Sequence, residues 1–550
     1  MLAKRAWLVL AAVAAAAYFY GLGAAPLMGP DEPRYAQVAR EMFKRGDWVT
    51  PTLAGHTWFE KPALLYWLMG AAYGAFGVTE FAARAGAALS GLLTVAAVGW
   101  AARRAEFESG EGLRAYGLTA AAVMASSAGL LVFSRGASFD VILTATVTAS
   151  LACFFASEVA RREWQSRGPL ALFYAGIGAS LLAKGLVGVV IPAGVVLLYF
   201  ALRRRPPGLL RLGLLWGPLV TLAVASLWYA PVIARHGWAF VDEFFVQHHF
   251  ARYASNKYHH PQPFYFYLPV MLMLALPWTA FAVAGLAAAV REMNWRAEDA
   301  ASRLRVLALA WFVVPVAFFS LSGSKLPGYV LPALPGAALL AADRVHRYVR
   351  GEGGLTAMRV TGVLALLLFA AGLAYAFQGL LPWGGGAGAP GLSTTCALFV
   401  VAPAGASGAL ALLWPGRRAL CATAVATGSL LTVVLIAGCA LGPASKRESV
   451  RGLLITAAEQ GHGSLPVFQL HAVERSAEFY AAGRLAYDAA GEPLKFEGAN
   501  QVEEAVRRSG GSGLVLVPTE HEGQLTGWEP FDARVLGSNG SYSLVLVKVR

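Results

Sequence analysis

Long apolar runs recur along most of this chain, and they constrain its fold more than any other feature. A helix needs ~20 mostly apolar residues to cross the hydrocarbon core of a bilayer. We expect about thirteen spans, near residues 6–25, 81–101, 114–134, 138–160, 169–183, 185–202, 213–234, 264–290, 305–322, 328–343, 359–381, 395–414 and 419–442. The apolar segment 62–78 is expected to form a re-entrant or interfacial helix. The sequence therefore predicts an α-helical polytopic membrane protein.

The charge content supports this prediction. Only 14% of the 550 residues are charged, whereas soluble domains carry about 25%. The net charge is +13, but the basic residues are concentrated in short loops between spans. Such loops determine topology and contact membrane lipids, so we do not expect the chain to bind nucleic acid.

The basic loops predict the orientation, because short loops rich in Lys and Arg stay in the cytoplasm. They occur on alternate connections: Lys4-Arg5, Arg103-Arg104-Arg114, Arg161-Arg162-Arg167, Arg203-Arg204-Arg205, Arg291-Arg296, Arg344-Arg347-Arg350 and Arg417-Arg418. The remaining connections, with most of the other polar groups, then face outward. The segment Lys4–Leu27 resembles a signal peptide, and we expect it to be an uncleaved signal anchor.

Two domains are expected. Residues 1–442 form the membrane domain, with outer loops at 26–80 and 235–263. Residues 443–550 form an outer soluble α/β domain, with helices at 449–459, 475–485 and 500–508, strands at 466–470 and 513–518, and a hairpin around Asn539-Gly540. The glycine-rich segment 384–391 is interpreted as a flexible loop rather than a phosphate cradle.

The cysteines are few and lie in apolar runs. Cys153, Cys396, Cys421 and Cys439 therefore predict neither a disulfide framework nor a cysteine metal site.

A polar segment at 29–61 follows the first apolar run and carries two charged clusters. These are Asp31-Glu32-Pro33-Arg34-Tyr35 and Glu60-Lys61. Ionisable groups at a membrane boundary are costly to desolvate, which makes them candidates for function. A helix is expected to begin near Pro33, and the simple alternative is that Asp31 only caps this helix.

Together with several later motifs, this segment resembles a known family. The Asp31–Tyr35 motif is similar to that of polyprenyl-phosphate-dependent glycosyltransferases of the protein O-mannosyltransferase type, which have the GT-C fold. The resemblance is closer to the lipid A aminoarabinose transferases. It is carried by PDEPRYAQVAREMFKRGDW, WFEKPALLYW, LLAKG at 181–185, FFVQHHFARY at 244–253, HHPQPFYFYLPV at 259–270 and SGSKLPGYVLP at 322–332.

The resemblance implies a reaction and a location. The donor would be undecaprenyl phosphate carrying 4-amino-4-deoxy-L-arabinose, and the acceptor a phosphate of lipid A. Masking that negative charge implies resistance to polymyxin and cationic peptides. The protein would lie in the bacterial inner membrane as a monomer, with its site facing the periplasm.

Displacement of a polyprenyl phosphate requires cations to neutralise the leaving group. The candidates are Arg34, Lys61, Lys184, Arg252 and Lys325. Lys184 has the alternative of an interfacial lysine that extends toward water, and Lys325 that of an ordinary loop lysine. Tyr35, Glu60 and Tyr329 are further candidates for binding the substrate.

Three carboxylates are candidates for catalysis: Asp31, Glu32 and Asp140. A hydroxyl acceptor would need a general base, whereas a lipid A phosphate is already anionic. Asp31 could therefore act as a base, orient the acceptor or bind the ammonium group of the sugar. Asp140 has the alternative of a helix N-cap.

No cofactor is required by this chemistry, although a zinc site is an open alternative. Glu60 and His249, with the pair His259-His260, offer N and O ligands of the kind that zinc binds. Two other functions also stay open at this point. One is a GT-C transferase that moves another sugar to a protein or glycan hydroxyl, and the other is a secondary transporter. Transporters tend to show repeats and broken helices at mid-membrane, and no repeat of fixed period is found in this sequence.

Overall fold

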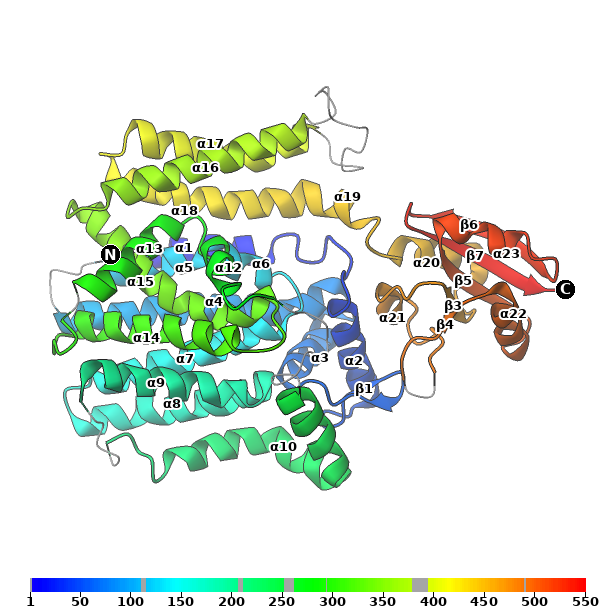
Figure 1. Ribbon diagram of the computed structural model, residues 1–550, viewed down its shortest axis with the longest axis horizontal. Coiled ribbons are helices and arrows are strands. Elements are labelled where there is room, and N and C mark those ends of the chain that lie inside the picture. The colour runs from blue at the N-terminus through cyan, green and yellow to red at the C-terminus, as the bar shows by residue number, and fades with distance from the viewer. Residues whose placement is uncertain are drawn as a thin grey trace.

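A bundle of long helices makes up most of the molecule, with a small α/β domain at one end (Figure 1). The computed structural model describes residues 2–109, 115–205, 211–251, 262–292, 294–377, 394–488 and 491–550. Three predicted features lie outside these ranges: Arg252, the pair His259-His260 and the glycine-rich segment 384–391.

The long helices of the bundle run roughly along its length, and shorter helices connect them (Figure 1). They are α1 (Leu2–Phe19), α4 (Glu80–Ser109), α5 (Tyr116–Ala125), α6 (Ala128–Phe133), α7 (Phe139–Glu158), α8 (Glu163–Lys184), α9 (Val187–Arg203), α10 (Gly217–Val241), η2 (Asp242–Ala251), α12 (Tyr267–Leu274), α13 (Thr279–Arg291), α14 (Ala300–Ser320), η3 (Pro327–Ala333), α15 (Leu334–Arg350), α16 (Leu355–Ala376), α17 (Thr394–Leu413), α18 (Arg418–Leu435), η5 (Ile436–Ala440) and α19 (Leu441–Ser445).

The described residues contain seven helices that are long and apolar enough to cross a membrane. Four shorter apolar helices of 10–17 residues accompany them. The predicted class of polytopic helical protein is therefore confirmed, while the count of about thirteen spans stays a prediction. The segment at 62–78 forms α3 (Leu64–Phe76), whose 13 residues are fewer than the ~20 that a span needs.

Two of the expected spans are broken in the structure, and the breaks face each other. The run 114–134 is divided into α5 and α6 at Ser126-Ser127, and the run 264–290 into α12 and α13. The amide of Ala128 donates to the carbonyl of Leu276 at 2.7 Å, and the indole of Trp278 donates to Ser126 Oγ at 2.9 Å. Each break thus satisfies backbone and side-chain groups that the other exposes, as a lipid environment requires.

The polar segment at 29–61 lies between the bundle and the C-terminal domain (Figure 1). It forms α2 (Glu32–Arg45) and a short hairpin of β1 (Thr52–Leu53) and β2 (His56–Thr57). Gly46 ends α2 in a left-handed conformation with φ 65°, which glycine adopts without strain. The Glu41 carboxylate accepts hydrogen bonds from Thr52, Ala54 and Gly55, so α2 fixes the position of the hairpin.

The C-terminal domain is a five-stranded mixed sheet in the order β4-β3-β5-β7-β6. Strands β3 (Val467–Leu470), β4 (Lys495–Phe496) and β5 (Ser512–Pro518) are parallel, and β6 (Phe531–Ser538) and β7 (Tyr542–Val549) form an antiparallel hairpin. Helices α20 (Arg451–Ala457) and α21 (Ser476–Tyr480) pack on one face, and α22 (Ala499–Arg508) and α23 (Gly523–Thr526) on the other. The predicted strands and the hairpin at Asn539-Gly540 are present, whereas β4 was not predicted.

The expectation that no disulfide forms is wrong. Cys396, in the first turn of α17, is bonded to Cys439 in η5, which continues α18. The two residues were assigned to the interior of apolar runs, but they lie near neighbouring ends of adjacent helices. Apolar neighbours in sequence therefore did not imply burial in the middle of a span.

Candidate active site

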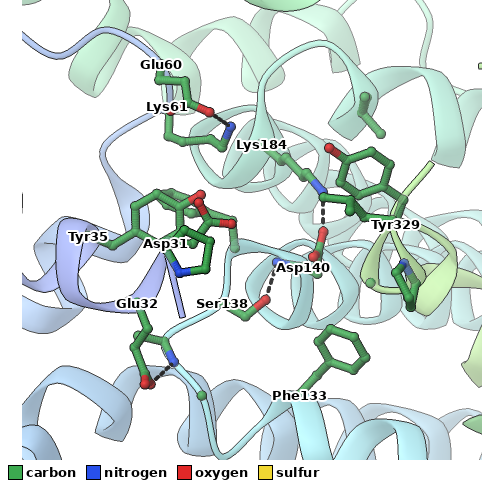
Figure 2. A pocket seen from close by; sticks show the side chains of 18 of the residues that line it. Asp31, Glu32, Tyr35, Glu60, Lys61, Phe133, Ser138, Asp140, Lys184 and Tyr329 are labelled. Carbon is green, nitrogen blue, oxygen red and sulfur yellow. Dashed lines mark hydrogen bonds and ion pairs between the residues drawn. The ribbon is translucent and has the colours of Figure 1, made fainter. Parts of the chain in front are cut away.

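A cavity of about 540 Å³ opens where the bundle meets the polar segment at 29–61. Five separate parts of the chain form its walls: the start of α2, residues 60–62, the α6–α7 connection, the end of α8 and the α14–η3 connection. Figure 2 shows Asp31 grouped around the cavity with two charged pairs, Glu60–Lys61 and Asp140–Lys184. Predicted site residues from distant parts of the sequence thus converge on one cavity.

Asp31 precedes the first turn of α2, but its side chain makes no capping hydrogen bond. The residue is exposed and lines the cavity. Its carboxylate has no hydrogen bond or ion pair with any residue that the structure describes. The alternative that Asp31 serves only as a helix cap is therefore not supported.

Glu32 differs from its neighbour because its carboxylate is fully engaged. Arg84 donates from Nε to Oε1 and from Nη2 to Oε2, both at 2.7 Å. The amides of Met28 and Ala137 donate to the same carboxylate at 3.1 and 2.9 Å. Glu32 lines the cavity, but these contacts favour a role in holding its walls together.

Glu60 and Lys61 form an ion pair at 2.6 Å on one wall. Both side chains are 13% exposed and line the cavity. Because the ammonium lies at the cavity surface, it is placed to meet an anionic group of a bound substrate.

Another part of the cavity lining carries Asp140, Lys184 and Tyr329. Ser138 caps α7 by accepting a hydrogen bond from the amide of Asp140 at 3.1 Å, so Asp140 is not the N-cap itself. The Asp140 carboxylate pairs with Lys184, whose ammonium lies 4.3 Å from the centre of the Tyr329 ring. Lys184 is therefore a member of a charged cluster and not an isolated interfacial lysine.

Gly328 makes this cluster possible. A Cβ at this position would overlap the carboxylate of Asp140 and lie 2.7 Å from the ring of Phe133. Only glycine lets η3 approach the start of α7 so closely.

Two predicted cations lie beside the cavity without lining it. Lys325 is buried and donates to the carbonyl of Ser322 at 2.6 Å. Arg34 lies 3.7 Å from Glu478 of the C-terminal domain, and its guanidinium is 5.2 Å from the Trp58 ring centre. Burial raises the pKa of Glu478, although Arg34 and Arg475 oppose the rise. Tyr35 is buried, lines the cavity and packs edge-on against Phe139.

Among the described residues no group of three or more His, Cys, Asp or Glu side chains could hold a metal ion. Glu60, the proposed ligand, is paired with Lys61. The side chain of its proposed partner His249 is outside the described residues.

Four residues at or near the site were not predicted: Arg84, Ser138, Gly328 and Glu478. Arg84 carries a visible signal, because an arginine inside an apolar run is costly and therefore functional by default. The other three depend on contacts between segments that are distant in sequence, which the pattern of one chain does not reveal.

The arrangement combines three chemical features. It offers a carboxylate that is unpaired within the described part of the chain, two ammonium groups and a partly apolar lining that includes Val132, Phe318 and Leu326. Such a cavity suits a ligand with an anionic head and an apolar tail.

Known proteins resemble the chain in sequence and in fold. Residues 5–229 match the family described as dolichyl-phosphate-mannose-protein mannosyltransferase. An undecaprenyl phosphate-α-4-amino-4-deoxy-L-arabinose arabinosyl transferase of Edwardsiella ictaluri (strain 93-146) is 34% identical over 69% of this chain and 66% of its own length. A transferase of the same name, numbered 2, from Sodalis glossinidius (strain morsitans) is 37% identical over 67% of this chain and 64% of its own length. The match therefore spans slightly less than two thirds of each of these relatives.

A solved structure shares the fold along nearly the whole chain. ArnT from Cupriavidus metallidurans, bound to undecaprenyl phosphate, superposes with a TM-score of 0.78 at 24% identity, over 98% of both chains. This likeness confirms the predicted GT-C fold with its C-terminal domain. The relatives by sequence and the matching family model show that the chain belongs to the aminoarabinose transferase family of the protein O-mannosyltransferase-like GT-C superfamily.

Proposed function

We propose that this protein is a glycosyltransferase that moves 4-amino-4-deoxy-L-arabinose from undecaprenyl phosphate to a phosphate of lipid A. The observation that carries the proposal is the cavity that Asp31 shares with Lys61 and Lys184, where Asp31 has no partner among the described residues. The relatives' names, and the lipid bound to ArnT of Cupriavidus metallidurans, support this donor.

The reaction exchanges one phosphate for another on the same sugar carbon. The bond from the anomeric carbon to the donor phosphate oxygen breaks, and a bond to a lipid A phosphate oxygen forms. Undecaprenyl phosphate leaves with the electron pair of the broken bond. Lys61 neutralises the charge that develops on the leaving phosphate, which is the main electrostatic demand of this displacement.

Asp31 has a different role, because the acceptor phosphate is already ionised and needs no general base. A carboxylate without a protein partner complements the ammonium group of the aminosugar. We therefore assign Asp31 to orienting the sugar between the donor and acceptor phosphates. Lys184, held by Asp140 and Tyr329, is assigned to the acceptor phosphate.

We further propose that the site faces the periplasm and that the domains divide near residue 442, in a protein that acts as a monomer. Two observations support the orientation. The basic loops alternate along the chain, and Cys396 and Cys439 form a disulfide, which is favoured in the oxidising periplasm.

Labelling with an impermeant thiol reagent tests this orientation. Glu520→Cys replaces a side chain in the C-terminal domain that is 79% exposed, and it should react in intact spheroplasts. Glu352→Cys replaces a side chain that is 48% exposed after the basic end of α15, and it should react only after lysis. The reverse pattern would place the cavity on the cytoplasmic side.

The activity itself is tested with purified protein, defined lipid donors and defined acceptors. Mass spectrometry should show a lipid A product that gains one aminopentose when undecaprenyl phosphate-aminoarabinose is supplied. Transfer only to a protein or glycan hydroxyl would support another GT-C transferase, and uptake without transfer would support a transporter.

We infer that the reaction requires no metal ion, so EDTA should leave the rate of transfer unchanged. Loss of activity on addition of EDTA, with recovery on addition of zinc, would contradict this inference.

A further inference from the structure

The C-terminal domain contacts the segment that carries Asp31 through three consecutive residues of α21. The carbonyl of Phe479 accepts a hydrogen bond from Arg40, whose guanidinium also lies 4.2 Å from the centre of the Phe479 ring. The hydroxyl of Tyr480 accepts from the amide of Leu27 at 2.7 Å and donates to Glu80 at 3.0 Å. Contacts on both sides of Asp31 therefore depend on this domain.

The third residue, Glu478, makes a contact that is incomplete. Its Oε2 lies 3.7 Å from Nε of Arg34, which is too long for a hydrogen bond. The two side chains are 0% and 12% exposed. Both atoms are buried without a hydrogen-bond partner, and a buried polar atom in that state calls for an explanation.

Glu478 and Arg34 differ in the hydrogen bonds that fix their side chains. Oε1 of Glu478 accepts a hydrogen bond from Arg475 at 2.8 Å, so the carboxylate is fixed within its own domain. The Arg34 guanidinium makes no hydrogen bond with any residue in the described ranges. A buried ion pair without hydrogen bonds does not recover the cost of desolvating its charges, so Arg34 is the member that an incoming anion can attract.

Arg34 is close enough to the site to meet such an anion. Its guanidinium lies against the ring of Trp58, which is two residues before Glu60 on the cavity wall. Its neighbours in the chain, Asp31, Glu32 and Tyr35, all line the cavity. A guanidinium also presents its donors in a planar fork that matches phosphate oxygens.

We propose that Glu478 is a positioning residue that holds Arg34 at the edge of the cavity and competes for it with the phosphate of the donor lipid. This inference rests on the proposed function, because it requires a lipid phosphate in the cavity. Donor binding then weakens the Arg34–Glu478 contact, and by linkage the contact weakens donor binding to the same extent. The C-terminal domain thereby senses whether the donor site is occupied.

The test is direct binding of undecaprenyl phosphate to full-length variants in detergent. Glu478→Gln keeps the shape of the side chain and an acceptor oxygen for Arg475, but it removes the competing charge. Neighbouring groups typically couple by about 0.5–3 kcal/mol, so we expect the affinity to rise about twofold or more. Glu492→Gln is the matched control, because Glu492 also pairs with Arg475 and makes no contact with Arg34. Its affinity should equal that of the parent.

A double variant assigns the effect to Arg34. In an Arg34→Gln background, Glu478→Gln should leave the affinity unchanged. Equal or weaker binding by the single variant Glu478→Gln, or the same gain without Arg34, would overturn the proposal. A residue that only supported the fold would lower stability and leave donor affinity as it was.

A second measurement needs no substitution. Amides of residues 476–482 in the parent protein should exchange hydrogen faster when undecaprenyl phosphate is bound, because the contact with Arg34 is lost. Unchanged or slower exchange at saturating lipid would overturn the competition. Failure of the parent protein to bind undecaprenyl phosphate at all would remove the proposed function and this inference together.

Discussion

Charged side chains gather at both ends of the helical bundle, but they are paired differently. At the end with the basic loops, Glu158 and Glu298 line a small cavity of about 190 Å³. Glu298 pairs with Arg203, Arg205 and Arg303, and Glu158 lies 3.5 Å from Arg203 and 3.9 Å from Arg303. Every carboxylate of this inner cluster is therefore shared between arginines.

At the other end, the cavity is almost three times larger and its charges are less satisfied. Asp140 has one lysine partner, and Asp31 has none among the described residues. The comparison shows that charge at a membrane boundary does not by itself mark a site. An ion-pair network can be structural, whereas a carboxylate left open to a cavity is available to a ligand.

The largest expected effect is at Asp31. Asp31→Asn keeps the size of the side chain and removes the charge that orients the sugar. Because misplacement of a substrate can cost about 100-fold, kcat should fall by about that factor with expression unchanged. Glu298→Gln is the control from the inner cluster and should transfer at the parental rate. Equal rates for the parent and Asp31→Asn would show that the charge of Asp31 does not contribute to transfer.

The next effect separates binding from orientation. Lys61→Ala should bind undecaprenyl phosphate about 10- to 150-fold more weakly, because one charged hydrogen bond contributes about 1.5–3 kcal/mol. Asp31→Asn should bind the same lipid almost as the parent does, since it loses no phosphate partner. Titration of the purified variants measures both, and parental affinity in Lys61→Ala would assign the phosphate to another cation.

A smaller effect is expected where η3 meets α7. Gly328→Ala forces a methyl group against Asp140 and Phe133, and overpacking of this kind costs typically about 1–3 kcal/mol. The rate of transfer should fall about tenfold as Asp140 and Lys184 are displaced. Gly168→Ala, where nothing lies within 4 Å of the added carbon, should show the parental rate. A parental rate in Gly328→Ala would show that the position of the Asp140–Lys184 pair does not affect transfer.

The smallest effect on transfer is expected in the inner cluster. Arg203 is 3% exposed, so Arg203→Ala should lower the free energy of unfolding by about 1–3 kcal/mol. The folded fraction should keep the parental rate of transfer. Thermal unfolding in detergent measures the loss of stability, and the rate of transfer is normalised to the amount of folded protein. A lowered normalised rate would show that the inner cluster also contributes to transfer.

The sequence predicted the polytopic helical class correctly, because the length of an apolar run follows directly from the thickness of the bilayer. The number of spans and the orientation given by the basic loops stay predictions. The sequence failed at the two broken spans, since the bond from Ala128 to Leu276 joins segments far apart in the chain. It also failed at Cys396 and Cys439, because the ends of helices are not visible within an apolar run.

The site was predicted in part for the same reasons. Asp31, Lys61, Asp140 and Lys184 are conspicuous because charge is rare in this chain, and the structure brings them to one cavity. Their separate roles depend on pairing. Sequence alone does not show that Arg84 donates hydrogen bonds to the Glu32 carboxylate, or that Arg34 lies against Glu478 of the C-terminal domain.

The dispersal of the cavity walls along the chain has a consequence for synthesis. A ribosome delivers the N-terminal segments first, so Asp31 and Lys61 enter the membrane long before Gly328. Until α14 and η3 have left the translocon, the Asp140–Lys184 pair has no Tyr329 above it and faces lipid or water. A nascent chain arrested before Pro327 therefore presents an open, charged flank between its helices, which membrane proteases and insertases can recognise as unfinished.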